Sequence, residues 1–156
     1  MVKAIQIGLG HWGFSWSKEV IPKVPAIEMA GFVDTNPEAT QRVQEELSID
    51  PKLCFGSLED AARHTDAELA LCTLRTEAHY PVVKRCLELG YNVLVEKPFT
   101  TTIAQGKELV ALAEAQGKVL MVSQNYRHQP APIAVAELIA AGKFGPLNMV
   151  GIDFRR

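Results

Sequence analysis

Short runs of continuously apolar residues alternate with amphipathic segments along most of the chain. Continuous apolar runs are typical of strands buried on both faces of a parallel sheet, whereas apolar side chains three or four residues apart indicate helices. The apolar runs predict strands over residues 2–7, 27–33, 53–55, 68–72, 91–95 and 119–122. The amphipathic segments predict helices over residues 14–22, 38–47, a brief stretch after Ser57, a segment that stops at Gly90, 103–116 and 133–141.

Several residues mark where these helices begin. Ser57 is a suitable N-cap, and residues 102–105 (TIAQ) have the spacing of a capping box. Pro81 is expected in the first turn of its helix only, because proline lacks the N–H that a helix interior uses.

The alternation predicts an α/β fold, namely a doubly wound, mostly parallel Rossmann sheet of strand order 3-2-1-4-5-6 with helices on both faces. Ligands of such sheets bind beyond the carboxyl ends of the strands, where the strand order reverses. The segments that leave the strand ends are therefore the candidate site: residues 8–13, 34, 73–76, 96–98 and 123–127.

The pattern changes after residue 146. Residues 148–156 (NMVGIDFRR) alternate apolar and polar side chains, as a half-exposed antiparallel strand does. We therefore predict a dinucleotide-binding Rossmann domain over residues 1–125. Residues 126–156 are predicted to be a linking helix and the first strand of a second α+β domain that is missing or truncated. On this interpretation the chain is the N-terminal part of a longer protein, or a piece trimmed at a domain boundary.

A glycine motif follows the first predicted strand directly. It reads GLGHWG and fits G-x-G-x-x-G between a strand and a helix, the context in which this motif binds a dinucleotide. Gly8 allows the tight turn, Gly10 lets the backbone approach a pyrophosphate, and Gly13 lets the helix pack against the sheet. A plain strand–helix turn is the alternative. The residues expected at the cofactor are Gly8, Leu9, Gly10, His11, Trp12 and Gly13.

Asp34 ends the second predicted strand, 21 residues beyond Gly13 (34 − 13). A carboxylate there accepts hydrogen bonds from the adenosine ribose and repels a 2′-phosphate, and residues 35–37 supply no cation. These features predict NAD rather than NADP. The alternative is that Asp34 caps the next helix, although Asn36, followed by Pro37, is better placed to do so.

Composition and charge narrow the class of protein. A formal net charge of −2 argues against a nucleic-acid or acidic-membrane partner, and no apolar run has the length of a membrane span. Cys54, Cys72 and Cys86 lack metal-ligand spacing, so we expect no metal site and read them as core residues in a reducing cytoplasm.

Four motifs together resemble the Gfo/Idh/MocA oxidoreductases, which include glucose–fructose oxidoreductase and inositol dehydrogenases. They are Gly8–Gly13, Val33–Pro37, Val95–Pro98 and Gln124–Arg127. The resemblance covers essentially the whole chain. It implies the NAD-binding domain of an oxidoreductase that transfers a hydride between nicotinamide and a hydroxyl of a sugar, cyclitol or other polyol. It also leaves open a homo-oligomer, because family dimers form through the sheet of the second domain.

Lys97 is the predicted catalytic residue. In the family the lysine of the Glu-Lys-Pro motif hydrogen-bonds the reacting hydroxyl, and oxidation of an alcohol needs such a group while the hydride leaves the carbon. The alternative is a surface lysine paired with Glu96.

Other strand ends add candidate cofactor contacts: Thr35, Thr73, Leu74, His79, Glu96, Gln124 and Arg127. The loop after the fourth strand departs from the family's Thr-Pro-Asn, and Arg75 there is a candidate for binding an anionic group instead. Arg127 either faces the cofactor or caps the adjacent helix.

The sequence is compatible with two functions. The first is the dehydrogenase, of which this chain binds cofactor but is catalytically incomplete, because the family's second domain carries the remaining proton-transfer residues and most of the substrate pocket. The second is a non-catalytic NAD-sensing or regulatory module. Lys97 favours the enzyme, because a sensor has no need of a proton donor beside the nicotinamide.

Overall fold

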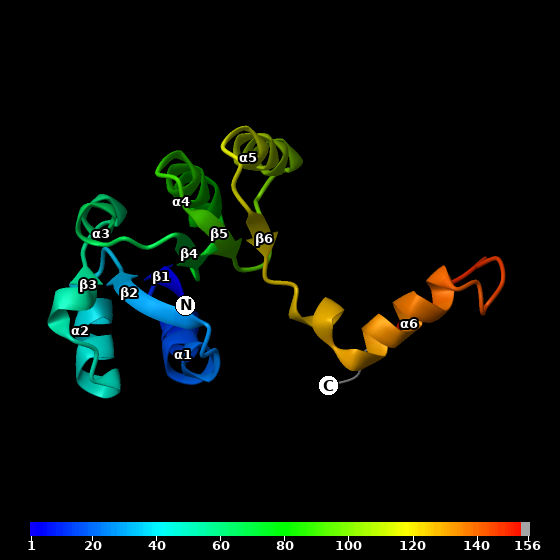
Figure 1. Ribbon diagram of the computed structural model, residues 1–156, viewed down its shortest axis with the longest axis horizontal. Helices are drawn as coiled ribbons and strands as arrows, with labels where there is room; N and C mark the ends of the chain where they lie inside the picture. The colour runs from blue at the N-terminus through cyan, green and yellow to red at the C-terminus, as the bar shows by residue number, and fades with distance from the viewer. Residues whose placement is uncertain (154–156) are drawn as a thin grey trace. The chain divides into compact units, whose positions relative to one another are not determined.

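The computed structural model describes residues 1–153, and the chain divides into two compact units, Met1–Ser123 and Gln124–Arg156. In the first unit six strands form one sheet of order β3-β2-β1-β4-β5-β6, and each pairing between them is parallel. The predicted strand order is therefore confirmed (Figure 1). The strands are β1 (Val2–Ile7), β2 (Ile27–Val33), β3 (Cys54–Phe55), β4 (Leu69–Cys72), β5 (Asn92–Val95) and β6 (Leu120–Val122).

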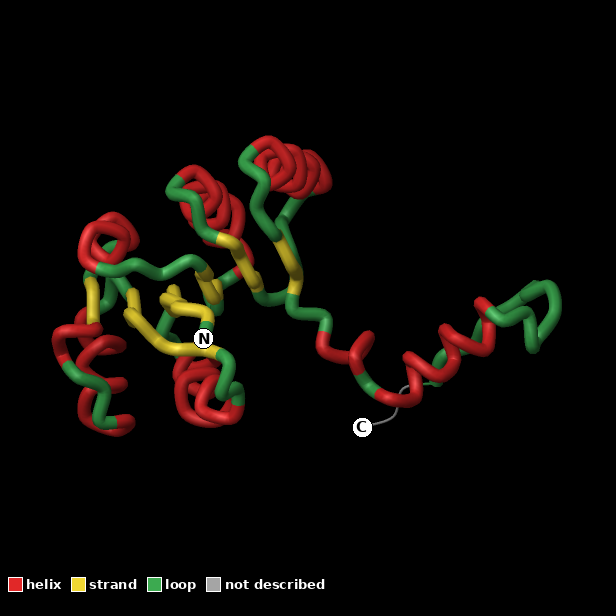
Figure 2. The backbone as a smooth tube through the Cα atoms, viewed as in Figure 1, coloured by secondary structure: helices red, strands yellow, loops and turns green. Residues whose placement is uncertain are grey.

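Helices cover both faces of this sheet. Figure 1 shows α1 and α2 on one face and α3, α4 and α5 on the other, which confirms the doubly wound arrangement, and Figure 2 gives the same view by element type. The helices are α1 (His11–Ser15), α2 (Pro37–Leu47), α3 (Leu58–His64), α4 (Thr76–Glu88) and α5 (Ile103–Ala115). Further helical turns are a π-helical segment (Trp16–Val20) and two 3-10 segments (Ile21–Lys23 and Pro51–Leu53).

The core lies between the sheet and its helices on each face. One cluster joins α1 and α2 to β2 through Leu9, Phe14, Phe32 and Val43. A larger cluster on the other face joins the central strands to α3, α4 and α5. Burial on both faces explains why the strand sequences are continuously apolar.

The cysteines are free thiols, and two of them are buried in the core. A hydrogen bond with Cys72, together with burial, raises the pKa of the Cys86 thiol well above its ordinary value. Cys86 therefore stays a neutral thiol and packs as a small apolar side chain.

The N-cap residues of α2, α3 and α5 are those predicted from the sequence. The Asn36 side chain accepts the Glu38 N–H at 3.0 Å, with Pro37 as the first residue of α2, and Ser57 accepts the Asp60 N–H at 3.1 Å. At α5 only half of the predicted capping box forms. Thr102 accepts the Gln105 N–H at 3.3 Å, while the Gln105 side chain accepts a hydrogen bond from the Thr101 hydroxyl.

Two predicted helix starts in the first unit are wrong. The first helix begins at His11 rather than at residue 14, because the last glycine of the motif is already helical. α4 begins at Thr76 and holds Pro81 in its interior. The turn before the proline carries the buried His79 ring, whose nitrogens contact carbonyl oxygens outside the helix.

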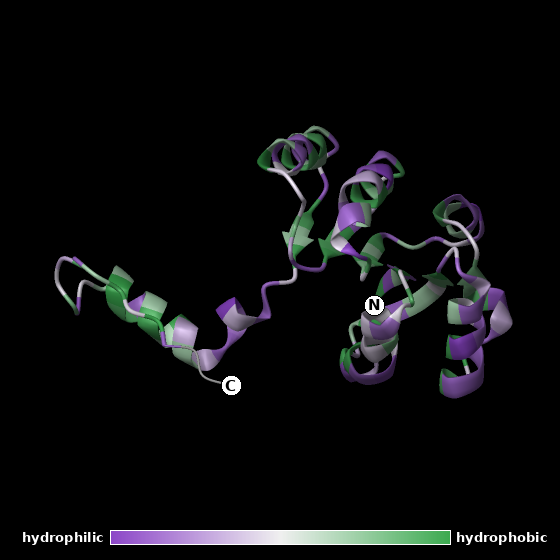
Figure 3. Cartoon of the chain, turned by 180° about the vertical axis from the view of Figure 1, so that it is seen from behind, coloured by the Kyte–Doolittle hydropathy of each residue, from purple (hydrophilic) through white to green (hydrophobic). Residues whose placement is uncertain are grey.

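The second unit contains a 3-10 segment (Asn125–His128) and α6 (Pro130–Ala140). α6 starts three residues before its predicted first residue, because Pro130 takes the first helical position, where proline is favoured. Much of the α6 ribbon has the green of hydrophobic residues in Figure 3. Ile133 and Val135 of this helix are exposed.

The strand predicted over residues 148–156 does not form over residues 148–153, and residues 154–156 lie outside the described residues. A strand needs a neighbour to complete its hydrogen-bond ladder, and residues 148–153 pair with no strand among residues 1–153.

No helix within residues 1–153 has the length and apolar character needed to cross a membrane.

Candidate functional site

The glycine loop between β1 and α1 has two positions that only glycine fits. Gly8 has a φ of +93°, in the left-handed region that side chains disfavour. A Cβ at Gly13 would lie 1.9 Å from the Gly8 carbonyl oxygen. The start of α1 therefore packs directly on the turn that precedes it, as the motif predicts.

Gly10 differs from the other two glycines. A Cβ built on it meets no atom within 4 Å, so its backbone is open on that side. The neighbouring Leu9 side chain is buried against Phe32, which anchors the loop, whereas His11 and Trp12 are exposed. The loop thus presents bare backbone to solvent at its middle glycine.

Asp34 lies beside this loop at the end of β2. One carboxylate oxygen accepts the Leu9 N–H at 2.7 Å, and the other accepts the Asn36 N–H at 2.8 Å. Asn36, not Asp34, caps α2. Two further acceptor positions remain on the carboxylate, because an ionised carboxylate has about four.

A cavity of about 460 Å³ opens at Asp34, within the size range of small-molecule sites. Apolar side chains from four elements form most of its wall, and Asp34 and Thr35 form part of its polar lining. The apolar lining comprises Ile7, Val33, Leu58, Leu74, Ala78, Pro81 and Val82. The remaining lining residues are Ser57, Glu59 and Arg85.

Arg85 is a cavity residue that the sequence analysis missed. Its guanidinium is paired with Glu59 at 3.0 Å and with Glu88 at 3.4 Å. The hydrogen bond from Arg85 lowers the pKa of the Glu59 carboxyl, so this pair stays charged at neutral pH. No local signal marks Arg85, because it lies 51 residues from Asp34 in the chain (85 − 34) and enters the cavity through the fold alone.

Thr73 and His79, both predicted at the cofactor, point into the protein. The Thr73 hydroxyl donates to the Gly8 carbonyl oxygen at 2.6 Å. The His79 ring has no exposed surface, with Nδ1 2.9 Å from the Pro98 carbonyl oxygen and Nε2 3.1 Å from that of Leu74. His79 thus braces the loop after β4 against the turn after β5. Direct contact of either side chain with a cofactor stays a prediction.

We expect His79→Leu to destabilise the first unit by about 1–3 kcal/mol, because the hydrogen bond that the buried ring makes to a loop carbonyl oxygen is lost. Denaturant unfolding measures this loss. His128→Leu, at an exposed histidine of the second unit, is the matched control and should change the unfolding free energy by less than about 0.5 kcal/mol. Equal unfolding free energies of the two variants would show that the contacts of His79 with the two loops do not stabilise the first unit.

The turn after β5 carries the Glu-Lys-Pro motif, and its Lys97–Pro98 peptide bond is cis. The Glu96 side chain is buried, and its carboxylate accepts the backbone N–H of Lys97 at 3.2 Å. Lys97 itself is exposed. Val95 pairs with Cys72 of β4, so the Lys97 turn and the loop after β4 leave the sheet at the same edge.

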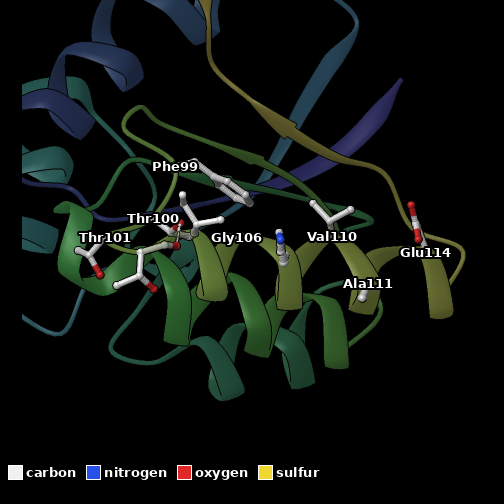
Figure 4. A pocket seen from close by; sticks show the side chains of 10 residues that line it. Phe99, Thr100, Thr101, Gly106, Val110, Ala111 and Glu114 are labelled. Atoms are coloured by element: carbon white, nitrogen blue, oxygen red, sulfur yellow. Dashed lines mark hydrogen bonds between the residues drawn. The ribbon is translucent and has the colours of Figure 1, made fainter.

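A larger hollow of about 630 Å³ lies elsewhere, along α5 (Figure 4). Its lining residues all come from the segment Phe99–Glu114, and none of them is a predicted cofactor contact. Within residues 1–153 no group of three or more His, Cys, Asp or Glu side chains is arranged to hold a metal ion.

Comparison with known proteins agrees with this geometry. A family model described as an oxidoreductase family with an NAD-binding Rossmann fold matches residues 2–124. The chain belongs to the Gfo/Idh/MocA family. The resemblance read from the four motifs is therefore confirmed, and the first unit is an NAD-binding Rossmann domain of this family.

Two curated relatives illustrate the range of the Gfo/Idh/MocA family. The chain is 38% identical over 97 residues to an uncharacterized oxidoreductase of Escherichia coli, YhhX, which covers 62% of the chain and 28% of that protein. It is 35% identical over 100 residues to the mouse trans-1,2-dihydrobenzene-1,2-diol dehydrogenase, covering 64% and 30%. The chain thus spans about a third or less of the length of these relatives.

A solved structure has the same fold at lower identity. The WlbA dehydrogenase from Chromobactrium violaceum, in complex with NADH and UDP-GlcNAcA, matches with a TM-score of 0.81 at 23% identity, over 92% of this chain and 41% of that one. At this identity the match establishes the fold of the Gfo/Idh/MocA chain and not its ligand.

Three further residues were singled out as candidate site residues, namely Gln124, Arg127 and Arg75. Gln124 and Arg127 belong to the second unit, and their contact with a cofactor stays a prediction. Arg75, the candidate for an anionic group, is exposed at the start of α4, with its Nε 3.7 Å from a Glu77 carboxylate oxygen.

Proposed function

We propose that this Gfo/Idh/MocA chain binds NAD in preference to NADP. We further propose that it serves an oxidoreductase that transfers a hydride between nicotinamide and a hydroxyl group of a sugar, cyclitol or other polyol. The observation that carries the proposal is Asp34, a carboxylate on the wall of the cavity and 2.7 Å from the Leu9 N–H of the glycine loop.

The residues present fit a bound NAD. The open backbone at Gly10 leaves room for the diphosphate, and the free acceptor positions of Asp34 suit the ribose hydroxyls. Leu58, Leu74 and Val82 offer an apolar wall for a flat base. When bound, NAD supplies the hydride acceptor. A 2′-phosphate would meet the Asp34 carboxylate, and the cation of the same cavity, Arg85, is already paired with Glu59.

The exposed ammonium group of Lys97 is proposed to hold or move the proton of the reacting hydroxyl. Its turn is fixed from within by Glu96 and is adjacent to the loop after β4. The names of the relatives support the substrate class, since one acts on a diol and another binds a nucleotide sugar. Lys97 also favours an enzyme over a sensor, because binding alone needs no group that handles a proton.

The deciding experiment titrates the chain with NADH and NADPH and follows tryptophan emission. A Trp16→Phe variant leaves Trp12, which is 53% exposed beside the glycine loop, as the single reporter. We expect saturable binding of NADH, at least about tenfold tighter than that of NADPH, which corresponds to 1.4 kcal/mol. Equal affinity for the two, or tighter binding of NADPH, would refute the proposed preference.

Lys97→Ala is expected to leave the Kd for NADH within about twofold and to lower any rate of polyol-dependent NADH formation by about 100-fold or more. Lys107→Ala, at an exposed lysine of α5, is the matched control and should change neither quantity. We expect the rate of the 156-residue chain itself to be small, because the chain spans only 30% of the mouse dehydrogenase. A rate that survives Lys97→Ala would remove the proposed role.

A further inference from the structure

A buried polar network lies beneath the glycine loop. Its centre is Gln6, one residue before the carboxyl end of β1, a side chain with no exposed surface. The Gln6 amide nitrogen donates to the Gly13 carbonyl oxygen at 2.7 Å and to the Thr73 hydroxyl at 3.1 Å. Its amide oxygen accepts the Ser17 hydroxyl at 2.6 Å. Both ends of the amide are therefore satisfied inside the protein.

Thr73 extends the network to the other side of the loop. Its single hydroxyl proton goes to the Gly8 carbonyl oxygen at 2.6 Å, and its oxygen accepts from Gln6. A buried amide costs free energy unless it is fully hydrogen-bonded, and a leucine in β1 would pack without that requirement. A glutamine at this buried position is thus explained by the loop segments that its hydrogen bonds hold in place.

The network holds the loop carbonyls toward the protein interior. The carbonyl of Gly8 points toward Thr73, and the carbonyl of Gly13 points toward Gln6. In a planar trans peptide the N–H points opposite to the carbonyl. The Leu9 N–H therefore points away from the network, and it meets the Asp34 carboxylate at 2.7 Å.

The helix after the loop is shaped to complete this arrangement. Ser17 lies in the π-helical segment Trp16–Val20, and its hydroxyl is within 3.1 Å of the Gly13 carbonyl oxygen as well as 2.6 Å from Gln6. π-helical turns are rare and frequently occur at functional sites. Here the wider turn accompanies the approach of Ser17 to β1.

We infer that Gln6, Ser17 and Thr73 are positioning residues that fix the glycine loop in its cofactor-binding conformation. The inference rests on the proposed NAD binding and deepens it. It assigns Thr73 a role beneath the loop and adds two residues absent from the sequence-based site, Gln6 and Ser17. The sequence signal for Gln6 was its polar side chain among the apolar residues 4–7.

The test compares Thr73→Val, which removes the hydroxyl at constant shape, with Thr73→Ser, which keeps it. Gln6→Met removes the amide at similar length and serves as a second variant. The first readout needs no cofactor: hydrogen exchange of the Leu9 and Phe14 amides, whose acceptors are Asp34 and the Gly10 carbonyl. The second is the Kd for NADH. The control is Leu109→Ala, a buried side chain of α5 outside the network.

Thr73→Val and Gln6→Met are expected to speed exchange of the two loop amides by at least about tenfold and to raise the Kd by a similar factor. Thr73→Ser should restore both, and Leu109→Ala should lower the melting temperature without either effect. Loop exchange as slow in Thr73→Val as in Leu109→Ala would overturn the inference, even if the wild-type chain bound no NADH. Fast exchange without wild-type NADH binding would support loop positioning and refute the proposed function instead.

Discussion

Gly10→Ala is expected to leave the chain folded and to weaken NADH binding by at least about tenfold, or 1.4 kcal/mol. A Cβ at this position touches nothing within 4 Å, so the folded chain accepts it and the unfolding free energy should change by less than about 1 kcal/mol. The new methyl group projects into the space proposed for the diphosphate. Titration with NADH and denaturant unfolding of the same preparation separate the two effects.

Gly13→Ala is the matched comparison, with the opposite expectation for stability. Its Cβ would lie 1.9 Å from the Gly8 carbonyl oxygen and 2.8 Å from the Thr73 hydroxyl, so the backbone has to move. The resulting loss of stability is expected to be about 3 kcal/mol or more.

If Gly10→Ala bound NADH as tightly as the wild type, the diphosphate would not approach the loop at Gly10, and the proposed placement of the cofactor would be wrong.

The sheet was predictable because its strands are buried on both faces. Continuous apolar runs such as residues 27–33 identify central parallel strands, and right-handed crossovers leave few possible strand orders. The glycine loop and its proximity to Asp34 could also be predicted from the sequence, because the spacing between them follows from the length of one strand–helix–strand unit. Local chemistry also identified the caps at Asn36 and Ser57.

The features that escaped prediction depend on contacts between distant parts of the chain. The contact between the buried His79 ring of α4 and the turn after β5 joins residues far apart in the sequence, and local rules did not predict Pro81 inside α4. Arg85 enters the cavity from α4, and its charge is neutralised by Glu59 of α3. Gln6 looks like an anomaly in an apolar strand until Ser17 and Thr73 are placed around it.

Asp34→Ala is expected to weaken NADH binding by about 10- to 100-fold, the effect of losing hydrogen bonds from the ribose to a charged acceptor. NADPH binding should weaken less, because the same substitution removes a negative charge beside the 2′-phosphate. The ratio of the two Kd values should therefore move toward one. Parallel titrations with both nucleotides measure this ratio directly.

The Asp34 carboxylate also anchors the glycine loop through the Leu9 N–H, so a loss of affinity alone does not identify a ribose contact. Loosening of the loop would weaken both nucleotides equally, whereas loss of the carboxylate's selectivity changes their ratio. Asn36→Ala supplies the control, since it removes the α2 cap at a cost of about 1 kcal/mol and leaves the Asp34 side chain in place. A ratio that stays constant in Asp34→Ala would assign Asp34 to loop anchoring alone, and the preference for NAD would then need another source.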